Sequence, residues 1–260
     1  MTHSTTSNKP IVRQTLKLLL AGLFWVGVWE LVYIIVDKDV IIASPADTAL
    51  RILSLAGEGE FWLICGASLL NILIGYLAGI LFGSLSSLAT YKLKTAETVF
   101  APLLYVIRAT PVASFILLAY FWMSNDLIPA FISFLMVVPI VWGNLREGFL
   151  NTDKDLLEMA KIYRFPAMKR LLKIELPAVI PYFLSGCRTA LGLAWKAGIA
   201  AEALVRTKGR IGNELQNAKI LIETVDIFAW TVVIILLSVV LEKLFVTLFD
   251  AVIRKRRAKL

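Results

Sequence analysis

The stretch from residue 151 to residue 177, NTDKDLLEMAKIYRFPAMKRLLKIELP, is the longest polar interruption in a chain otherwise built from apolar runs. Apolar residues recur in it at helical spacing, in two stripes: Leu156, Leu157, Ala160 and Tyr163, then Leu171, Leu172, Ile174 and Leu176. Thr152 followed by Asp155 predicts a capped helix start, and Pro166 suits the first turn of a second helix. We expect a short helix, a turn and a short helix, held between two membrane spans.

The composition indicates an all-α, polytopic membrane protein. Hydrophobic residues make up 58% of the 260 residues, against about 45–50% in soluble domains. Cys65 and Cys187 both lie in apolar runs and His3, the only histidine, lies in a polar tail, so neither a disulfide nor a metal site is indicated.

Six transmembrane helices are expected from the apolar runs. Their approximate ranges are 18–36, 61–89, 111–123, 127–144, 177–204 and 226–253. A helix over 46–55 is too short to cross the ~30 Å hydrocarbon layer and is expected at the interface. Residues 91–98 are predicted as a polar loop, 124–126 as a tight turn and 206–225 as a polar outer loop. The domain prediction is a tail over 1–17, a six-span domain over 18–253 that includes the polar loop 145–177, and a basic tail over 254–260.

The distribution of Lys and Arg predicts the orientation of these spans. Seventeen of them fall in the N-terminal tail, residues 91–98, residues 145–177 and the C-terminal tail, whereas six fall in the opposite set of loops. Because positive charge is retained on the cytoplasmic side, both termini and residues 145–177 are expected in the cytoplasm. The net charge of +8 is then explained by contact with membrane lipid, not nucleic acid.

No catalytic constellation is visible in the sequence. Paired His and carboxylate residues, a Gly-x-Ser-x-Gly elbow and Cys/His metal spacing are all missing. The sequence also lacks a Gly-x-x-x-x-Gly-Lys-Ser/Thr phosphate loop, so if the protein is a pump, another chain must bind the nucleotide. We therefore predict no enzyme activity, no cofactor and no metal.

The fifth predicted span carries three ionisable residues, Arg188, Lys196 and Glu202. Charges at membrane depth are costly unless they face a partner or water, and by default they mark a functional site. Arg188 and Lys196 are eight residues apart, about 80° around a helix, so both can face one cavity that attracts anions. Glu202 lies on another face, near the outer end, and the three residues are the candidates for a translocation path. The alternative is that they form buried salt bridges or extend to an interface. In the second span, Gly75, Gly79 and Gly83 recur every four residues and predict a helix-packing face.

The polar stretch resembles the cytoplasmic loop of ABC importer permeases, whose pattern is Glu-Ala-Ala, three residues, Gly, nine residues, Ile-x-Leu-Pro. The matching residues are Glu158, Met159, Ala160, Ile174, Leu176 and Pro177, with Met159 at an Ala position and Arg164 at the Gly position. A non-Gly residue in a left-handed turn costs about 1–2 kcal/mol, so either this turn is built differently or Arg164 tolerates strain. The segments SPADTALRIL and GCRTALGLAWKAGIAAEAL, and Arg108 with Pro111, resemble the nitrate/sulfonate/taurine type.

This resemblance covers about 42–244 and implies a type I ABC importer permease fold. It further implies a homodimer in the cell membrane, two ATPase subunits that bind the loop of Glu158, an extracytoplasmic substrate-binding protein, and a translocation path lined by the fifth span. A heterocyclic vitamin precursor such as a thiamine pyrimidine stays open beside nitrate, sulfonate or taurine. An ATP-independent channel or carrier, and an intramembrane enzyme or assembly factor, are the other classes.

Overall fold

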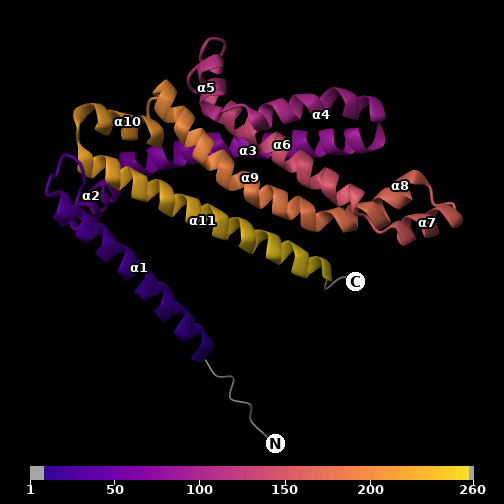
Figure 1. The fold of residues 1–260 in the computed structure, drawn as a ribbon, viewed down its shortest axis with the longest axis horizontal. Coiled ribbons are helices and arrows are strands. Elements are labelled where there is room, and N and C mark those ends of the chain that lie inside the picture. The colour runs from indigo at the N-terminus through magenta and orange to yellow at the C-terminus, as the bar shows by residue number, and fades with distance from the viewer. Residues whose placement is uncertain (1–8, 258–260) are drawn as a thin grey trace, which may run out of the picture.

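Three long helices, α3 (Gly59–Lys92), α6 (Ile128–Leu150) and α9 (Leu176–Val205), pack side by side and form the centre of the molecule (Figure 1). The structure is a computed structural model. It describes the backbone of residues 9–257 and the side chains of Lys17 and of residues 20–249. Every regular element in the described range is a helix. The others are α1 (Lys9–Val36), α2 (Pro45–Ala56), α4 (Lys94–Ala109), α5 (Val112–Tyr120), α7 (Lys154–Ile162), α8 (Ala167–Arg170), the π-helix η1 (Leu171–Glu175), α10 (Ile211–Leu221) and α11 (Thr224–Arg257).

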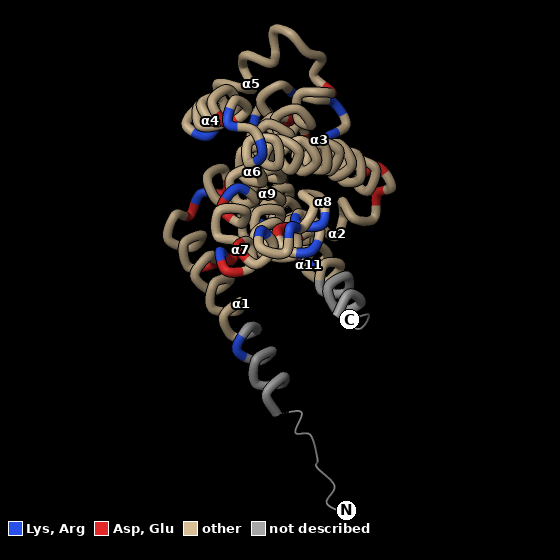
Figure 2. Tube along the Cα trace, turned by 90° about the vertical axis from the view of Figure 1, so that its right-hand side faces the viewer, with Lys and Arg blue, Asp and Glu red and all other residues tan. Residues whose placement is uncertain are grey.

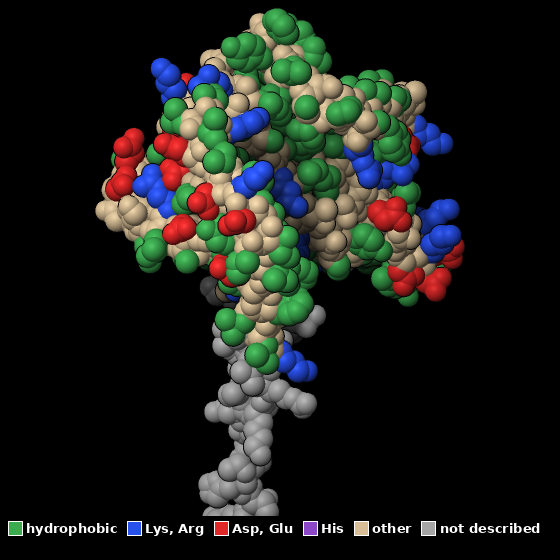
Figure 3. Space-filling model, turned by 60° about the vertical axis from the view of Figure 1, so that its left-hand side comes forward, with side chains coloured by type: hydrophobic (Ala, Val, Ile, Leu, Met, Phe, Trp, Pro, Cys, Tyr) green, Lys and Arg blue, Asp and Glu red, His purple; other side chains and the backbone are tan. Residues whose placement is uncertain are grey.

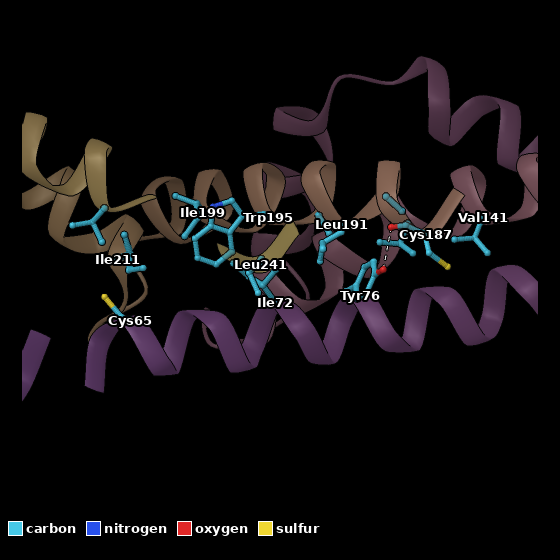
Figure 4. Packing of buried hydrophobic residues seen from close by; sticks show 14 of the residues in the cluster. Cys65, Ile72, Tyr76, Val141, Cys187, Leu191, Trp195, Ile199, Ile211 and Leu241 are labelled. Atoms are coloured by element: carbon cyan, nitrogen blue, oxygen red, sulfur yellow. Dashed lines mark hydrogen bonds between the residues drawn. The ribbon is translucent and has the colours of Figure 1, made fainter. Parts of the chain in front are cut away.

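The hydrophobic core lies between α3 and α9, with contributions from α6, α10 and α11. Ile72 and Tyr76 of α3 point toward Leu191 and Trp195 of α9, and all four are buried (Figure 4). The Tyr76 hydroxyl donates a hydrogen bond of 3.0 Å to the carbonyl oxygen of Cys187, which satisfies the one polar atom of that buried ring. α9 is thereby fixed along most of its length.

Gly75, Gly79 and Gly83 all face α6. A Cβ atom at Gly75 would overlap the backbone carbonyl of Ala130, and one at Gly79 would lie 2.6 Å from Cβ of Val137. The absence of side chains on this face of α3 lets the two helix backbones approach closely.

The number of membrane spans follows partly from the helix lengths. Among the described residues, α3, α6 and the Thr224–Phe249 part of α11 are each long and apolar enough to cross a membrane, and α4 with α5 qualifies as a bent pair. The described apolar part of α1 covers Leu20–Val36, and the 30-residue α9 is not among these spans by the same criteria of length and composition. The all-helical fold is confirmed, while the count of six spans stays a prediction.

The region before α6 differs from the sequence prediction. Residues 91–98 do not form a loop, because only Leu93 separates α3 from α4. The helix expected over 111–123 is shorter than predicted: α5 has nine residues, and it meets α4 at an angle of 101°. The bend falls at Pro111 because the residue before a proline is driven out of helical geometry, and Thr110 has φ −83° and ψ 134°.

The predicted tails and outer loop are more helical than expected. α1 begins at Lys9, inside the predicted tail 1–17, and α11 reaches Arg257. Residues 1–8 and 258–260 lie outside the described residues. α10 occupies the middle of the predicted outer loop. α1 diverges from the other helices (Figure 1) and is held near its C-terminal end, where Nε1 of Trp29 donates to the carbonyl oxygen of Ala43.

Candidate functional site: the α7 surface and the exposed face of α9

α7 projects from one end of the molecule, and its start differs from the prediction. The capping residue is Asp153, whose carboxylate accepts a hydrogen bond of 2.9 Å from the backbone N–H of Asp155. Thr152 is instead buried, and its hydroxyl donates to the carbonyl oxygen of Gly148 at the end of α6. The cap predicted at Thr152 is therefore wrong by one residue.

The turn after α7 contains Arg164 in a left-handed conformation, with φ +50°. The backbone N–H of Phe165 closes the turn by donating to the carbonyl oxygen of Ala160 at 2.8 Å. Of the two possibilities for Arg164, the strained one therefore holds: the turn keeps a geometry suited to glycine, at a cost of about 1–2 kcal/mol.

The outer surface of α7 is apolar around one exposed acid. Glu158 is exposed, and so are Leu156, Met159, Ile162 and Tyr163, whereas Ala160 is 1% exposed. Only Ala160 of the predicted first stripe packs fully inward, because Leu156 and Tyr163 turn outward. Charged residues of α7 and α8 gather at the end of the molecule that faces the viewer in Figure 2. We call Leu156, Glu158, Met159, Ile162 and Tyr163 the α7 surface.

Glu175 anchors the base of this region. Its side chain is fully buried and forms ion pairs with Lys92 at 3.0 Å and with Arg170 at 2.8 Å. These contacts join the end of α3 to α8 and η1. Ile174 is also buried, whereas Leu176 and Pro177 are exposed at the start of α9. Because α8, η1 and α9 follow one another without a break, the predicted second helix is continuous with the fifth span.

One face of α9 is exposed along the middle of the helix. Its exposed residues recur at intervals of three or four: Ser185, Arg188, Thr189, Leu193, Lys196 and Ala200. We call them the α9 row. Lys and Arg side chains lie in a hollow on the face shown in Figure 3. The row therefore brings Arg188 and Lys196 to one exposed side, as their spacing predicts.

Two cavities border the α9 row. The larger, of about 680 Å³, lies between the α4–α5 bend, α6 and α9, and its polar lining includes Arg108, Asn144, Arg146, Glu147 and Thr189. Arg146 is paired with Glu97. The smaller, of about 310 Å³, lies between α9 and α11 and is lined by Arg188, Thr189, Trp195, Ser238 and Glu242, among others. Thr189 lines both. We call them the corner cavity and the α9/α11 pocket.

Arg188 and Lys196 differ in their partners. Nε and Nη2 of Arg188 donate to one oxygen of Glu242, at 2.9 and 2.6 Å. Lys196 has no ion-pair partner within 4.0 Å among the described residues. An ammonium group in a span is costly unless it meets water or an anion, so the row contains one engaged and one available cation.

Glu202 lies elsewhere, away from the α9 row. It is fully buried, and one carboxylate oxygen accepts from the Ser68 hydroxyl at 2.9 Å and from the N–H of Gly212 at 3.1 Å. The Ser68 oxygen accepts in turn from the N–H of Ile211. Since Arg210 provides no side-chain cap, Glu202 and Ser68 supply the cap of α10 from two other helices. Its placement gives Glu202 a structural role.

Sequence reasoning missed Glu175, Glu242 and Ser68. Glu242 lies in an apolar run, and that position at membrane depth was a usable signal. Ser68 and Glu175 carried none, because their partners are distant in sequence.

Comparisons with known proteins were consistent with one another. A family model described as "Binding-protein-dependent transport system inner membrane component" matches residues 75–259. The nitrate import permease protein NrtB of Leptolyngbya laminosa is 28% identical over 213 residues, covering 74% of this chain and 72% of that protein. The taurine transport system permease protein TauC of Escherichia coli (strain K12) is 23% identical over 220 residues, covering 82% and 80%.

A solved structure supports the fold. The crystal structure of an amino acid ABC transporter with histidines matches with a TM-score of 0.58 at 17% identity, covering 80% of this chain and 96% of that chain. At this identity the similarity concerns the arrangement of helices alone.

Proposed function

The chain belongs to the family of inner membrane components of binding-protein-dependent transport systems, and on that premise we propose that it conducts a small anion along the α9 row. The protein is an ABC importer permease subunit, and ATP hydrolysis is carried by a separate subunit. The proposed cargo is of the nitrate, sulfonate or taurine type. Relatives named for nitrate and taurine support this choice.

The observation that carries the proposal is the exposure of Lys196. It lies in the middle of a membrane helix, on the same face as Arg188, without a carboxylate partner among the described residues. Burying such a charge in lipid costs at least ~2.5–3.5 kcal/mol, so the α9 row needs water or an anion beside it. The corner cavity and the α9/α11 pocket open beside Arg188, Thr189 and Leu193 of the same row, whereas Lys196 lines neither of them. A heterocyclic vitamin precursor gains no comparable support from this row.

A homodimer is the proposed assembly. In a single chain the α9 row is open. Gly192 and Ala200 have small side chains or none, which leaves room for another helix to approach closely. A second copy that faces the row would enclose a path between the two α9 helices, with two Lys196 ammonium groups along it.

Coupling to the ATPase is assigned to the α7 surface. Its exposed apolar side chains and Glu158 match a hydrophobic interface with one charged contact. In the proposed orientation α7, α8 and both termini are cytoplasmic, and α10 faces the substrate-binding protein outside. The domain arrangement proposed from the sequence is retained, with the loop 145–177 as the coupling segment.

The test is uptake by the assembled transporter with Lys196 replaced. Lys196→Met should lower anion uptake roughly tenfold, the effect of losing one hydrogen bond to a charged group. Lys196→Arg keeps the charge and should preserve most of the uptake. Co-purification of the ATPase with both variants controls for assembly. Normal uptake by the Met variant would remove the argument for an anionic cargo.

A further inference from the structure

The ion pair between Arg188 and Glu242 is unusual because it is open to the surroundings. The Arg188 side chain is 58% exposed and the Glu242 side chain is 52% exposed. Glu175 and Glu202 differ from Glu242, because both are fully buried and held by two donors each. A half-exposed pair that meets water contributes little to stability, because water and other ions then compete for both partners.

Each partner of this ion pair keeps a polar group that makes no hydrogen bond to the described residues. Both Arg188 donors converge on Oε1 of Glu242. The second carboxylate oxygen and Nη1 of Arg188 make no hydrogen bond within the described part of the chain. A guanidinium group prefers to hold two oxygens with two parallel bonds. The Arg188 group therefore retains donors for another acceptor.

The surroundings of the pair suit a small oxyanion. The α9/α11 pocket of about 310 Å³ is lined by Arg188 and Glu242 together with Thr189, Ser238 and Trp195. Thr189 also lines the corner cavity, so the pocket adjoins the larger space. Carboxylate, nitrate and sulfonate groups present similar oxygens to a guanidinium fork, and the Glu242 carboxylate occupies the position that such a group would take.

We propose that Glu242 is an internal counter-ion of Arg188, which an oxyanion substrate displaces during transport. The inference rests on the proposed function and names the substrate class: a small anion with at least two acceptor oxygens. In the unloaded state Glu242 neutralises Arg188 at membrane depth. In the loaded state the substrate takes the guanidinium donors, with Thr189 and Ser238 as additional ones. Because Glu242 competes with the substrate for Arg188, the substrate binds weakly, and weak binding favours its release.

The test measures binding of nitrate and methanesulfonate to the permease–ATPase complex in lipid nanodiscs by calorimetry, without binding protein. Glu242→Gln removes the competing charge and should tighten anion binding about fivefold, the upper value for an exposed pair. Glu242→Asp keeps the charge with a shorter reach, and should tighten binding less. Arg188→Gln should abolish the tightening when combined with Glu242→Gln. Glu60→Gln, an exposed acid in the first turn of α3, is the matched control.

The outcomes separate this inference from the proposed function. Unchanged or weaker anion binding in Glu242→Gln would overturn the counter-ion role, even where the native complex takes up anions. If Glu242→Gln fails to assemble with the ATPase, the Glu242→Asp variant is measured instead. Tighter anion binding by that variant supports the counter-ion role, and unchanged or weaker binding overturns it. The proposed anionic cargo fails separately, through normal uptake by Lys196→Met.

Discussion

Glu202 and Lys196 lie six residues apart on α9 and differ completely in environment. Glu202 is fully buried against Ser68 and Gly212, whereas Lys196 is exposed on the α9 row. Glu202 therefore stabilises the fold, and Lys196 is available to a ligand. A Cβ atom at Gly212 would approach Cβ of Glu202 to 2.5 Å, which leaves no room for another residue at that contact.

Replacing Glu202 with Ala should loosen the start of α10. The N–H of Gly212 and the hydroxyl of Ser68 lose their acceptor, and leaving buried donors unpaired costs about 1–3 kcal/mol. Hydrogen exchange measured by mass spectrometry should accelerate in a peptide covering 208–215. Glu223→Ala, an exposed acid after α10, is the control. Unchanged exchange in Glu202→Ala would contradict the capping role.

At the scale of elements, the contact between α3 and α6 depends on residues without side chains. Gly75, Gly79 and Gly83 lie where a Cβ would meet α6, whereas Gly66 of the same helix has nothing within 4 Å. The same substitution should therefore have opposite effects at Gly75 and at Gly66.

Gly75→Ala should lower the thermal unfolding midpoint of the purified protein. The new methyl group meets the backbone of Ala130, which cannot rotate away, and overpacking costs about 1–3 kcal/mol. Gly66→Ala should be neutral or stabilising, by up to about 1 kcal/mol, because alanine favours helix. Equal midpoints for the two variants would show that the packing face is not closely fitted.

The sequence predicted the elements that depend on local pattern. The helix over 46–55 and the turn at 124–126 follow from capping and turn residues, and the structure has both, while the location of that helix at the membrane interface stays a prediction. Thr and Asp are both residue types that cap helices, so the sequence allows a cap at Thr152 or at Asp153. Only the tertiary contact of Thr152 with Gly148 decides between the two positions. The loop predicted at 91–98 failed because charged residues at a membrane surface tolerate helix as readily as loop.

The candidate site was predictable where it depends on helical spacing. Arg188 and Lys196 lie on one side of α9 because eight residues turn the helix by only about 80° beyond two full turns. The role of Glu202 could not be predicted, since its partners lie 134 and 10 residues away. A charge in a span indicates that a partner exists, but not which one.

At the scale of the whole molecule, the charged ends suggest its orientation in the membrane. α7 and α8 lie at one end of the long axis and α2 and α10 at the other (Figure 1). The excess of Lys and Arg at the first end predicts that it is cytoplasmic.

Thiol labelling of intact cells tests the orientation. Lys219→Cys, exposed on α10, should react with an impermeant reagent added outside, whereas Lys161→Cys, exposed on α7, should react only after the cells are opened. The natural cysteines, Cys65 and Cys187, are buried and should add little background. If only Lys161→Cys were labelled in intact cells, the orientation would be the opposite of the one predicted.

The measurement that tests the central claim most directly is ATP hydrolysis by the transporter reconstituted with its ATPase and loaded binding protein. The account assigns coupling to Glu158, which is exposed on α7 among apolar side chains. Loaded binding protein should stimulate hydrolysis by the native complex. Glu158→Lys reverses the charge at the interface and should abolish that stimulation, while the permease stays in the membrane. Stimulated hydrolysis that survives Glu158→Lys unaltered would contradict the account.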